Sequence, residues 1–326
     1  MNPQELLSIF ATVAWTVTAP ILLLVGLGYI LGRAFRLDLG TMTKLNLYAL
    51  VPALLFVRFT ESGATGAEMW TIAGYWALLI LVMWGLSEGF SAAFSLPPSG
   101  RANVSVGAMF ANTGNFGIPV MDLAFGAAGV AFQAVILAVE NVLSFTLGAF
   151  LLSGASGRES GRYAALGGAG QVRKGIEGVL KLPIIYVLVA ALVFRSWPEW
   201  LPPPAWKALH YLDAGLIPLA LLTLGAQLGA RPLPRFNGEL SLAVVLRLAV
   251  APLSALAIVL VLRPSRELAE MLVVAAGFPT AVNTGLLAIE FRRNPRLSSA
   301  IVLWTTVLSL FTVTAIIAVV KALSAG

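Results

Sequence analysis

The sequence predicts an all-α polytopic membrane protein in which ten transmembrane helices form two inverted repeats of five helices. Composition is the first reason, because 59% of the 326 residues are hydrophobic and only 11% are charged, whereas soluble domains carry about 25% charged residues. The second reason is a series of apolar segments near the roughly 20 residues that a helix needs to cross a bilayer. The third is a pair of motifs that occurs once in each half of the chain.

Ten apolar segments follow one another along the chain, with short polar connections between them. They are 10–32, 43–59, 69–94, 102–121, 128–152, 179–197, 206–229, 239–262, 268–290 and 297–322. The second, fourth and seventh segments are short or interrupted. We expect each segment to cross the lipid bilayer once.

A polar connection divides the ten segments into five and five. It runs from Ser153 to Gly178, contains several Arg and Lys residues, and is rich in Gly and Ser, a composition typical of a flexible linker. The predicted organisation is therefore a first five-helix repeat over 1–153, a linker over 154–178 and a second five-helix repeat over 179–326.

The distribution of positive charge predicts the orientation. Most Lys and Arg residues lie in the connections on the same side of the membrane as the linker, and cytoplasmic connections carry the excess of these residues. We therefore expect a plasma-membrane protein with a cytoplasmic linker and both termini outside. The net charge of +6 is spread in short clusters between the spans, so we expect no nucleic-acid partner.

Two motifs recur at matching positions of the two halves. Pro52–Phe56 in the second span resembles Pro218–Leu222 in the seventh, and Asn112–Gly114 in the fourth matches Asn283–Gly285 in the ninth. An odd number of crossings turns the second copy over, so a five-span repeat must be inverted. Inverted repeats with interrupted helices place a substrate site near the midplane of the membrane.

Helix-breaking residues accompany the second motif in both halves. Gly114, Gly117 and Pro119 lie in the fourth span, and Gly277 and Pro279 lie in the ninth. Gly loosens a helix and Pro removes a backbone donor, and freed backbone groups are tolerated at membrane depth only where protein or water satisfies them. We predict that these residues interrupt both helices, so that four half-helix ends meet in the middle of the membrane.

The polar residues around the two interruptions are candidate substrate ligands. The N-terminal ends of half-helices present N–H groups that suit a carboxylate. The amides of Asn112, Asn115 and Asn283 and the hydroxyls of Thr113 and Thr284 add further hydrogen-bonding groups. The alternative is that these side chains join neighbouring helices and that the glycines allow close packing.

Three more polar residues lie inside predicted spans. Glu140 and Asn141 lie in the fifth span, where Asn141 is a further candidate ligand and Glu140 is either a proton or ion coupling site or a structural contact. Arg247, in the eighth span, is a candidate charge partner for an anion. Its structural alternatives, reaching the interface or pairing with a carboxylate, are favoured.

The residues do not predict an enzyme. Cys is absent, His occurs once, and the chain contains no Gly-rich nucleotide-binding loop followed by Lys. We therefore expect no catalytic residues, cofactor or metal, and a secondary transporter for a small organic anion. The alternatives are a proton- or sodium-coupled symporter that uses Glu140 and, from another class, an intramembrane enzyme or signalling scaffold.

Together these features resemble the auxin efflux carrier family in its bacterial permease form. The resemblance covers nearly the whole chain and rests on the five-plus-five division, the Asn112–Pro119 stretch and Pro279 with Asn283, with support from 52–56 and 218–225. The family is related to the bile acid/sodium symporters. Its members include plant auxin exporters and bacterial permeases for malonate, malate or related acids, and the short linker resembles the bacterial members.

The resemblance implies a fold and a mechanism. Spans one, two, six and seven would form a scaffold domain, and the others a core domain in which the discontinuous fourth and ninth helices cross at Pro119 and Pro279. Asn112 and Asn283 would then face the substrate carboxylate, and the core would slide against the scaffold like an elevator. The resemblance also implies a homodimer that forms through the scaffold.

Overall fold

The computed structural model describes residues 3–35, 37–61, 66–154, 183–230 and 234–325. Within these residues the chain is helical and contains no named strand. The only extended pairing there is an isolated antiparallel bridge between Ala111 and Thr280. The predicted linker, 154–178, lies almost wholly outside the described residues.

The first half consists of eight α-helices and four π-helical turns. The helices are α1 (Pro3–Val13), α2 (Ala19–Ala34), α3 (Leu39–Leu45), α4 (Val51–Glu61), α5 (Gly66–Ala93), α6 (Pro98–Met109), α7 (Ile118–Leu143) and α8 (Ala149–Gly154). The turns are η1 (Ala14–Thr18), η2 (Asn46–Leu50), η3 (Thr113–Gly117) and η4 (Ser144–Gly148). Each turn joins two elements without a break, except that η3 follows a short extended segment after α6.

The described part of the second half is also helical. Its helices are α10 (Pro183–Ser196), α11 (Pro203–Gly229), α12 (Gly238–Val245), α13 (Ala251–Leu262), α14 (Arg266–Ala276), α15 (Val282–Glu290) and α16 (Pro295–Ala325). A 3₁₀ turn, η6 (Pro198–Trp200), precedes α11, and a π-helical turn, η7 (Leu246–Val250), joins α12 to α13.

Seven helical stretches in the described part are long and apolar enough to cross a membrane. They are Leu7–Ala34, Leu39–Glu61, Gly66–Ala93, Thr113–Leu152, Pro203–Gly229, Gly238–Leu262 and Pro295–Leu323. The helices at the predicted fourth, sixth and ninth spans are shorter. The protein is thus a multi-pass membrane protein, and the number of ten crossings stays a prediction.

The longest of these stretches contains a sharp change of direction. Gly126, inside α7, has φ of 62° and ψ of −146°, a conformation open to glycine because it lacks a Cβ. The chain therefore divides here into two helices. The bend lies between 121, where the predicted fourth span ends, and 128, where the predicted fifth begins, and the two separate crossings stay a prediction.

Local capping fixes the start of α3. The Asp38 carboxylate accepts hydrogen bonds from the backbone N–H groups of Gly40 and Thr41, at 2.9 and 3.3 Å, and from the Thr41 hydroxyl at 2.6 Å. The Thr41 hydroxyl, together with these backbone groups, holds the pKa of Asp38 below its ordinary value. The cap satisfies N–H groups that the first turn of a helix leaves free.

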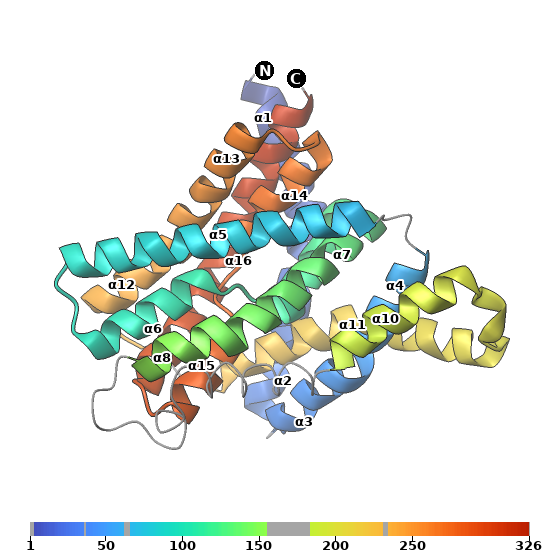
Figure 1. The fold of residues 1–326 in the computed structure, drawn as a ribbon, viewed down its shortest axis with the longest axis horizontal. Helices are drawn as coiled ribbons and strands as arrows, with labels where there is room; N and C mark the ends of the chain where they lie inside the picture. Colours follow the sequence, from blue (N-terminus) through green and yellow to red (C-terminus); the bar gives the residue numbers. More distant parts are fainter. Residues whose placement is uncertain (1–2, 36, 62–65, 155–182, 231–233, 326) are drawn as a thin grey trace.

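Helices α2 and α11 pack at close range because each presents glycines to the other. A Cβ added to Gly28 would lie 2.2 Å from the Leu222 carbonyl oxygen, and one added to Gly225 would lie 2.0 Å from the Val25 carbonyl oxygen. Small residues let two helix backbones approach in a membrane. The α4 helix packs against α11 and α10, so these helices form one group at the lower right of the molecule (Figure 1).

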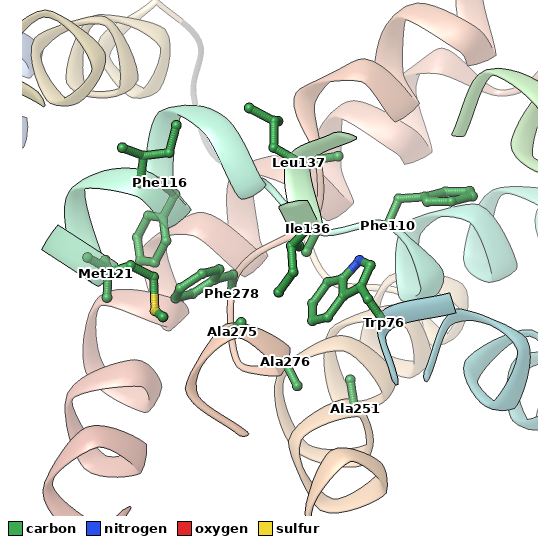
Figure 2. Close-up of a cluster of buried hydrophobic side chains, with 14 of the residues drawn as sticks. Trp76, Phe110, Phe116, Met121, Ile136, Leu137, Ala251, Ala275, Ala276 and Phe278 are labelled. Carbon is green, nitrogen blue, oxygen red and sulfur yellow. The ribbon is translucent and has the colours of Figure 1, made fainter. Parts of the chain in front are cut away.

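A second group of helices surrounds the two helical interruptions. Helix α5 packs against α6, α7 and α13, and α16 packs against α6, α12, α14 and α15. Figure 1 shows α1 and α16 side by side at the end of the molecule where both termini lie. The two interruptions lie in the interior, among buried side chains that come from both halves of the chain (Figure 2).

Candidate functional site

Two interrupted helices meet at the centre of the structure. The first interruption separates α6, which ends at Met109, from η3, and the second separates α14, which ends at Ala276, from α15. The Asn112 N–H donates to the Pro279 carbonyl oxygen at 2.7 Å, and the Ala281 N–H donates to the Phe110 carbonyl oxygen at 2.9 Å. Each extended segment therefore satisfies backbone groups of the other, as a buried interruption requires.

Aromatic packing fixes the two interruptions against each other. The rings of Phe116 and Phe278 meet edge to face, with their centroids 5.6 Å apart and their planes at 66°. Both side chains are fully buried, and Figure 2 shows them facing each other next to Met121. Such aromatic pairs add to the stabilisation that burial alone provides.

The first interruption lies upstream of the residues that predicted it. The helix breaks at 110–112, whereas Gly114 and Gly117 belong to the π-helical turn η3 and Pro119 lies in the first turn of α7. A π-turn changes the hydrogen-bonding register, and a proline costs little in the first turn of a helix. In the second interruption, Gly277 and Pro279 do lie in the segment between the two helices.

Gly117 lies in close contact with its neighbours. A Cβ at this position would lie 2.6 Å from Nε2 of Gln133 and 3.0 Å from Cε2 of Phe278. The same Gln133 nitrogen donates to the Thr113 carbonyl oxygen at 3.0 Å. Gln133 therefore anchors η3 to α7, and a side chain larger than that of glycine at position 117 would require Gln133 or η3 to shift.

Arg247 binds the C-terminal ends of both helices that precede the interruptions. Its Nη1 donates to the carbonyl oxygens of Ala108 at 2.9 Å and Met109 at 3.3 Å, and its Nη2 donates to that of Ala276 at 2.6 Å. The side chain is 1% exposed. A cation suits this place because helix C-termini carry partial negative charge and unpaired carbonyl groups.

Glu140 lies on the other side of the first interruption. One carboxylate oxygen accepts the indole N–H of Trp76 at 2.6 Å, and the other accepts the backbone N–H of Ala111 in a short hydrogen bond. The carboxylate is buried and within electrostatic range of Arg247. Both oxygens thus hold structural donors, one of them in the interrupted segment itself.

A cavity of about 100 Å³ lies beside the interruptions. Its first wall consists of the two segments Ala111–Asn115 and Ala281–Asn283. Both segments lie at the N-terminal ends of the helices that follow the interruptions, so N–H groups and positive helix ends are on the cavity side. The C-terminal ends, by contrast, are held by Arg247, which does not line the cavity.

Two more helices complete the cavity. Thr43, Asn46, Leu47 and Val51 line it from α3, η2 and α4, and Leu137, Glu140, Asn141 and Ser144 line it from α7 and η4. Both sets follow the three- and four-residue spacing of one helix face. Glu140 is the charged residue among the lining residues.

Four of the predicted ligands, with Asn141, are brought together in this cavity. Asn112, Thr113, Asn115 and Asn283 line it, and Nδ2 of Asn112 is buried without a hydrogen-bond partner among the described residues. Asn141 also lines it, although its Nδ2 donates to the Leu137 carbonyl oxygen of its own helix at 2.8 Å.

Thr284 is separate from this group. It lies outside the lining of the cavity, and its hydroxyl donates to the Ala281 carbonyl oxygen at 2.8 Å. A threonine hydroxyl that is occupied in this way stabilises the start of α15.

Sequence reasoning missed three polar residues at this site. Asn46 lines the cavity with an unpartnered amide among the described residues. Gln133 anchors η3, and the Thr280 hydroxyl donates to the Gly107 carbonyl oxygen at 2.7 Å. Each has an amide or hydroxyl group inside a predicted span, and a polar side chain at membrane depth could have marked it as a candidate. In the described part of the chain, no cluster of His, Asp and Glu has a metal-binding arrangement.

Comparison with known proteins now identifies the family. A family model described as a membrane transport protein matches residues 13–162 and 179–317, which is most of the chain. The chain belongs to this auxin efflux carrier-like family. The predicted family is therefore confirmed, and this member of the membrane transport protein family is a multi-pass membrane transporter.

Two relatives cover nearly all of this transporter. An uncharacterized transporter of Methanothermobacter thermautotrophicus is 28% identical over 302 residues, which are 89% of this chain and 93% of the relative. A protein of Rhizobium meliloti named "Putative malonate transporter" is 27% identical over 308 residues, which are 91% of this chain and 93% of that protein.

Proposed function

We propose that this protein is a secondary transporter that moves a small organic anion, a mono- or dicarboxylate, across the plasma membrane. The observation that carries the proposal is the division of charge around the interruptions. The N-terminal helix ends and Asn112, whose Nδ2 has no partner among the described residues, lie at the cavity, while the buried cation Arg247 holds the C-terminal helix ends. A carboxylate in the cavity would find N–H donors there, while Arg247 stays bound to the carbonyl groups.

The substrate contacts follow from this arrangement. Asn112, Thr113, Asn115, Asn141 and Asn283 line the cavity, and their amides and hydroxyl can donate to carboxylate oxygens. The name of the Rhizobium meliloti relative points to the same chemical class.

The proposed architecture is ten crossings in two inverted repeats, with the interrupted helices crossing. Three observations support the repeat. Trp76 and Arg247 have the same sequence separation as Asn112 and Asn283. Arg247 donates to the helix ends that precede the interruptions, and Trp76 donates to Glu140, which binds the first interruption. The bend at Gly126 lies between the proposed fourth and fifth crossings.

The proposed motion is a slide of a core against a scaffold. The group formed by α2, α4, α10 and α11 supports a scaffold made of spans one, two, six and seven. Arg58 of this group contacts Asp213 within the group at 3.3 Å and Asp122 of α7 at 3.9 Å. A slide would have to break and remake the contact with Asp122.

Access to the two sides of the membrane would then alternate. The cavity is lined by Asn46 and Ser144, which lie toward the linker side of their spans, so we place it on the cytoplasmic side. A second cavity of about 720 Å³, lined by Glu61, Glu68 and Glu267 among others, lies toward the predicted outer side. Alternating access requires that the substrate site can be reached from each side of the membrane in turn, and we propose that these two cavities provide that access. The predicted homodimer through the scaffold remains part of this proposal.

Flux through purified protein tests the proposed function. We expect wild-type protein in proteoliposomes to carry radiolabelled malonate or a monocarboxylate such as acetate, and Asn112→Ala and Asn283→Ala to lose at least tenfold of that flux. Both variants should melt near the wild-type temperature, because Asn112 Nδ2 has no hydrogen-bond partner to lose among the described residues.

Gly285→Ala is the matched control for these variants. Gly285 lies two residues from Asn283, and a Cβ there would meet nothing within 4 Å, so its flux should equal that of wild type. Wild-type flux in Asn112→Ala and Asn283→Ala would refute the proposed site. Recovery of the substrate in altered form would instead favour the alternative of an intramembrane enzyme.

A second candidate function is coupling of transport to a proton or sodium gradient through Glu140. The observation that favours it is that this carboxylate lines the cavity, since intramembrane carboxylates commonly serve as coupling sites. Its two hydrogen bonds, to Trp76 and to Ala111, favour a structural role.

A further inference from the structure

One polar side chain that lines the cavity has no role in the substrate contacts proposed so far. Asn46 begins the π-helical turn η2 and is 2% exposed. Neither its Oδ1 nor its Nδ2 has a hydrogen-bond partner in the part of the chain that the structure describes. Buried amides are nearly always paired, so both groups of this side chain remain available to a ligand.

Asn46 lines the cavity from a different part of the chain than the amides at the interrupted helices. Asn112, Asn115 and Asn283 belong to the interrupted helices, whereas Asn46 belongs to the α3–η2–α4 segment, which packs against α11. A ligand that places a carboxylate at the helix N-terminal ends would therefore present its other end to the α3–η2–α4 wall.

The rest of that wall offers little else to a polar group. Leu47 and Val51 are apolar, and the Thr43 hydroxyl already donates to the Leu39 carbonyl oxygen at 2.8 Å. Asn46 supplies one donor group and one acceptor. No Lys or Arg lies among the residues that line the cavity, so a second negative charge would have no cation beside it.

From this geometry we propose that Asn46 selects acids with a second, uncharged polar group, such as a hydroxyl or a protonated carboxyl, at the end opposite the transported carboxylate. The proposal rests on the proposed function and names its substrate class more narrowly. The amide Nδ2 can donate a hydrogen bond to a hydroxyl oxygen and Oδ1 can accept one from the hydroxyl, whereas an alkyl group of the same size would leave both amide groups buried and unpaired.

Two acids of equal size test the proposal. In 3-hydroxypropionate a hydroxyl stands where butyrate has a methyl group, so their flux ratio measures recognition of the hydroxyl alone. Wild-type protein in proteoliposomes should move 3-hydroxypropionate about tenfold or more faster than butyrate at low concentration. In Asn46→Leu, which has nearly the same shape, the ratio should fall to about one while butyrate flux is kept or increased.

Two further variants serve as controls for misfolding of Asn46→Leu and for general effects of changing this helix face. Asn46→Ala should also remove the preference, so the test survives if the leucine variant does not fold. Thr43→Val, on the same helix face but with an occupied hydroxyl, should keep the wild-type ratio. Both Asn46 variants should melt at or above the wild-type temperature, because they remove an unpaired buried amide.

The outcomes separate this proposal from the proposed function. Equal flux of the two acids in wild type, or a preserved preference in Asn46→Leu and Asn46→Ala, overturns the role of Asn46 and leaves the carboxylate transporter intact. Collapse of folding in both Asn46 variants also overturns it, because the amide would then be structural. Absence of flux for both acids and for malonate overturns the proposed function, and this inference with it.

Discussion

The two sides of the paired interruptions differ in how their backbone groups are satisfied. On one side, the carbonyl groups that end α6 and α14 are bound by a single buried guanidinium, Arg247. On the other side, the N-terminal ends of η3 and α15 open on a cavity whose amides include unpartnered groups in the described structure. Under the proposed function, the contacts on the first side stabilise the fold, whereas the amides on the second side are available to a ligand.

The largest effect is expected on the side of Arg247. Arg247→Met should lower the free energy of unfolding by about 3–5 kcal/mol, because it leaves carbonyls at two buried helix ends and Glu140 without the cation. The measurement is the melting temperature of the detergent-solubilised protein. Arg247→Lys, which keeps the charge but loses the planar fork, should lie between this variant and wild type.

An unchanged melting temperature in Arg247→Met would contradict the structural role of Arg247. If Arg247→Met kept the wild-type melting temperature and lost only flux, the guanidinium would belong to the substrate site and not to the helix ends.

A smaller effect is expected from Glu140, which lines the cavity and also holds the first interruption. Glu140→Gln should cost about 2–3 kcal/mol of stability, because an amide can accept from only one of the two N–H donors of Trp76 and Ala111. The flux of wild type and variant should be measured across pH and sodium gradients. Trp76→Phe, which removes one donor and keeps the carboxylate, is the control.

Those fluxes decide between the two roles of Glu140. Flux that ignores both gradients in wild type excludes coupling through this residue. A gradient dependence that is present in wild type and Trp76→Phe but absent in Glu140→Gln would instead establish coupling.

The smallest change in stability is expected from substitutions of two glycines, Gly117 and Gly285, that follow the two interruptions. Gly117→Ala should destabilise the protein by about 1–2 kcal/mol, since its Cβ would meet Gln133 and Phe278. Gly285→Ala has open space and should be neutral or stabilising by up to about 1 kcal/mol. Melting temperatures measure both, and equal values would show that η3 can shift to accept a side chain.

Much of the helical order could be predicted because hydrophobic length alone controls it. The segments around 10–32, 69–94 and 239–262 are predominantly apolar, and the structure has span-length helices there. The interruption at 277–281 could be predicted because Gly277 and Pro279 lie within it. The interruption at 110–112 was predicted a few residues too late, at 114–119. No Gly or Pro lies within 110–112, and its hydrogen bonds come from a segment far along the chain.

The sequence by itself determined that this protein crosses the membrane many times, which family it belongs to, and which amides lie near the helical interruptions. Those properties follow from local composition and motifs. Only the tertiary structure decided that Arg247 faces helix ends rather than the cavity, that Thr284 is occupied locally, and that Asn46 joins the site. The reason is that a side chain inside a membrane protein takes its role from the partners that packing brings to it, and spacing along one helix does not specify them.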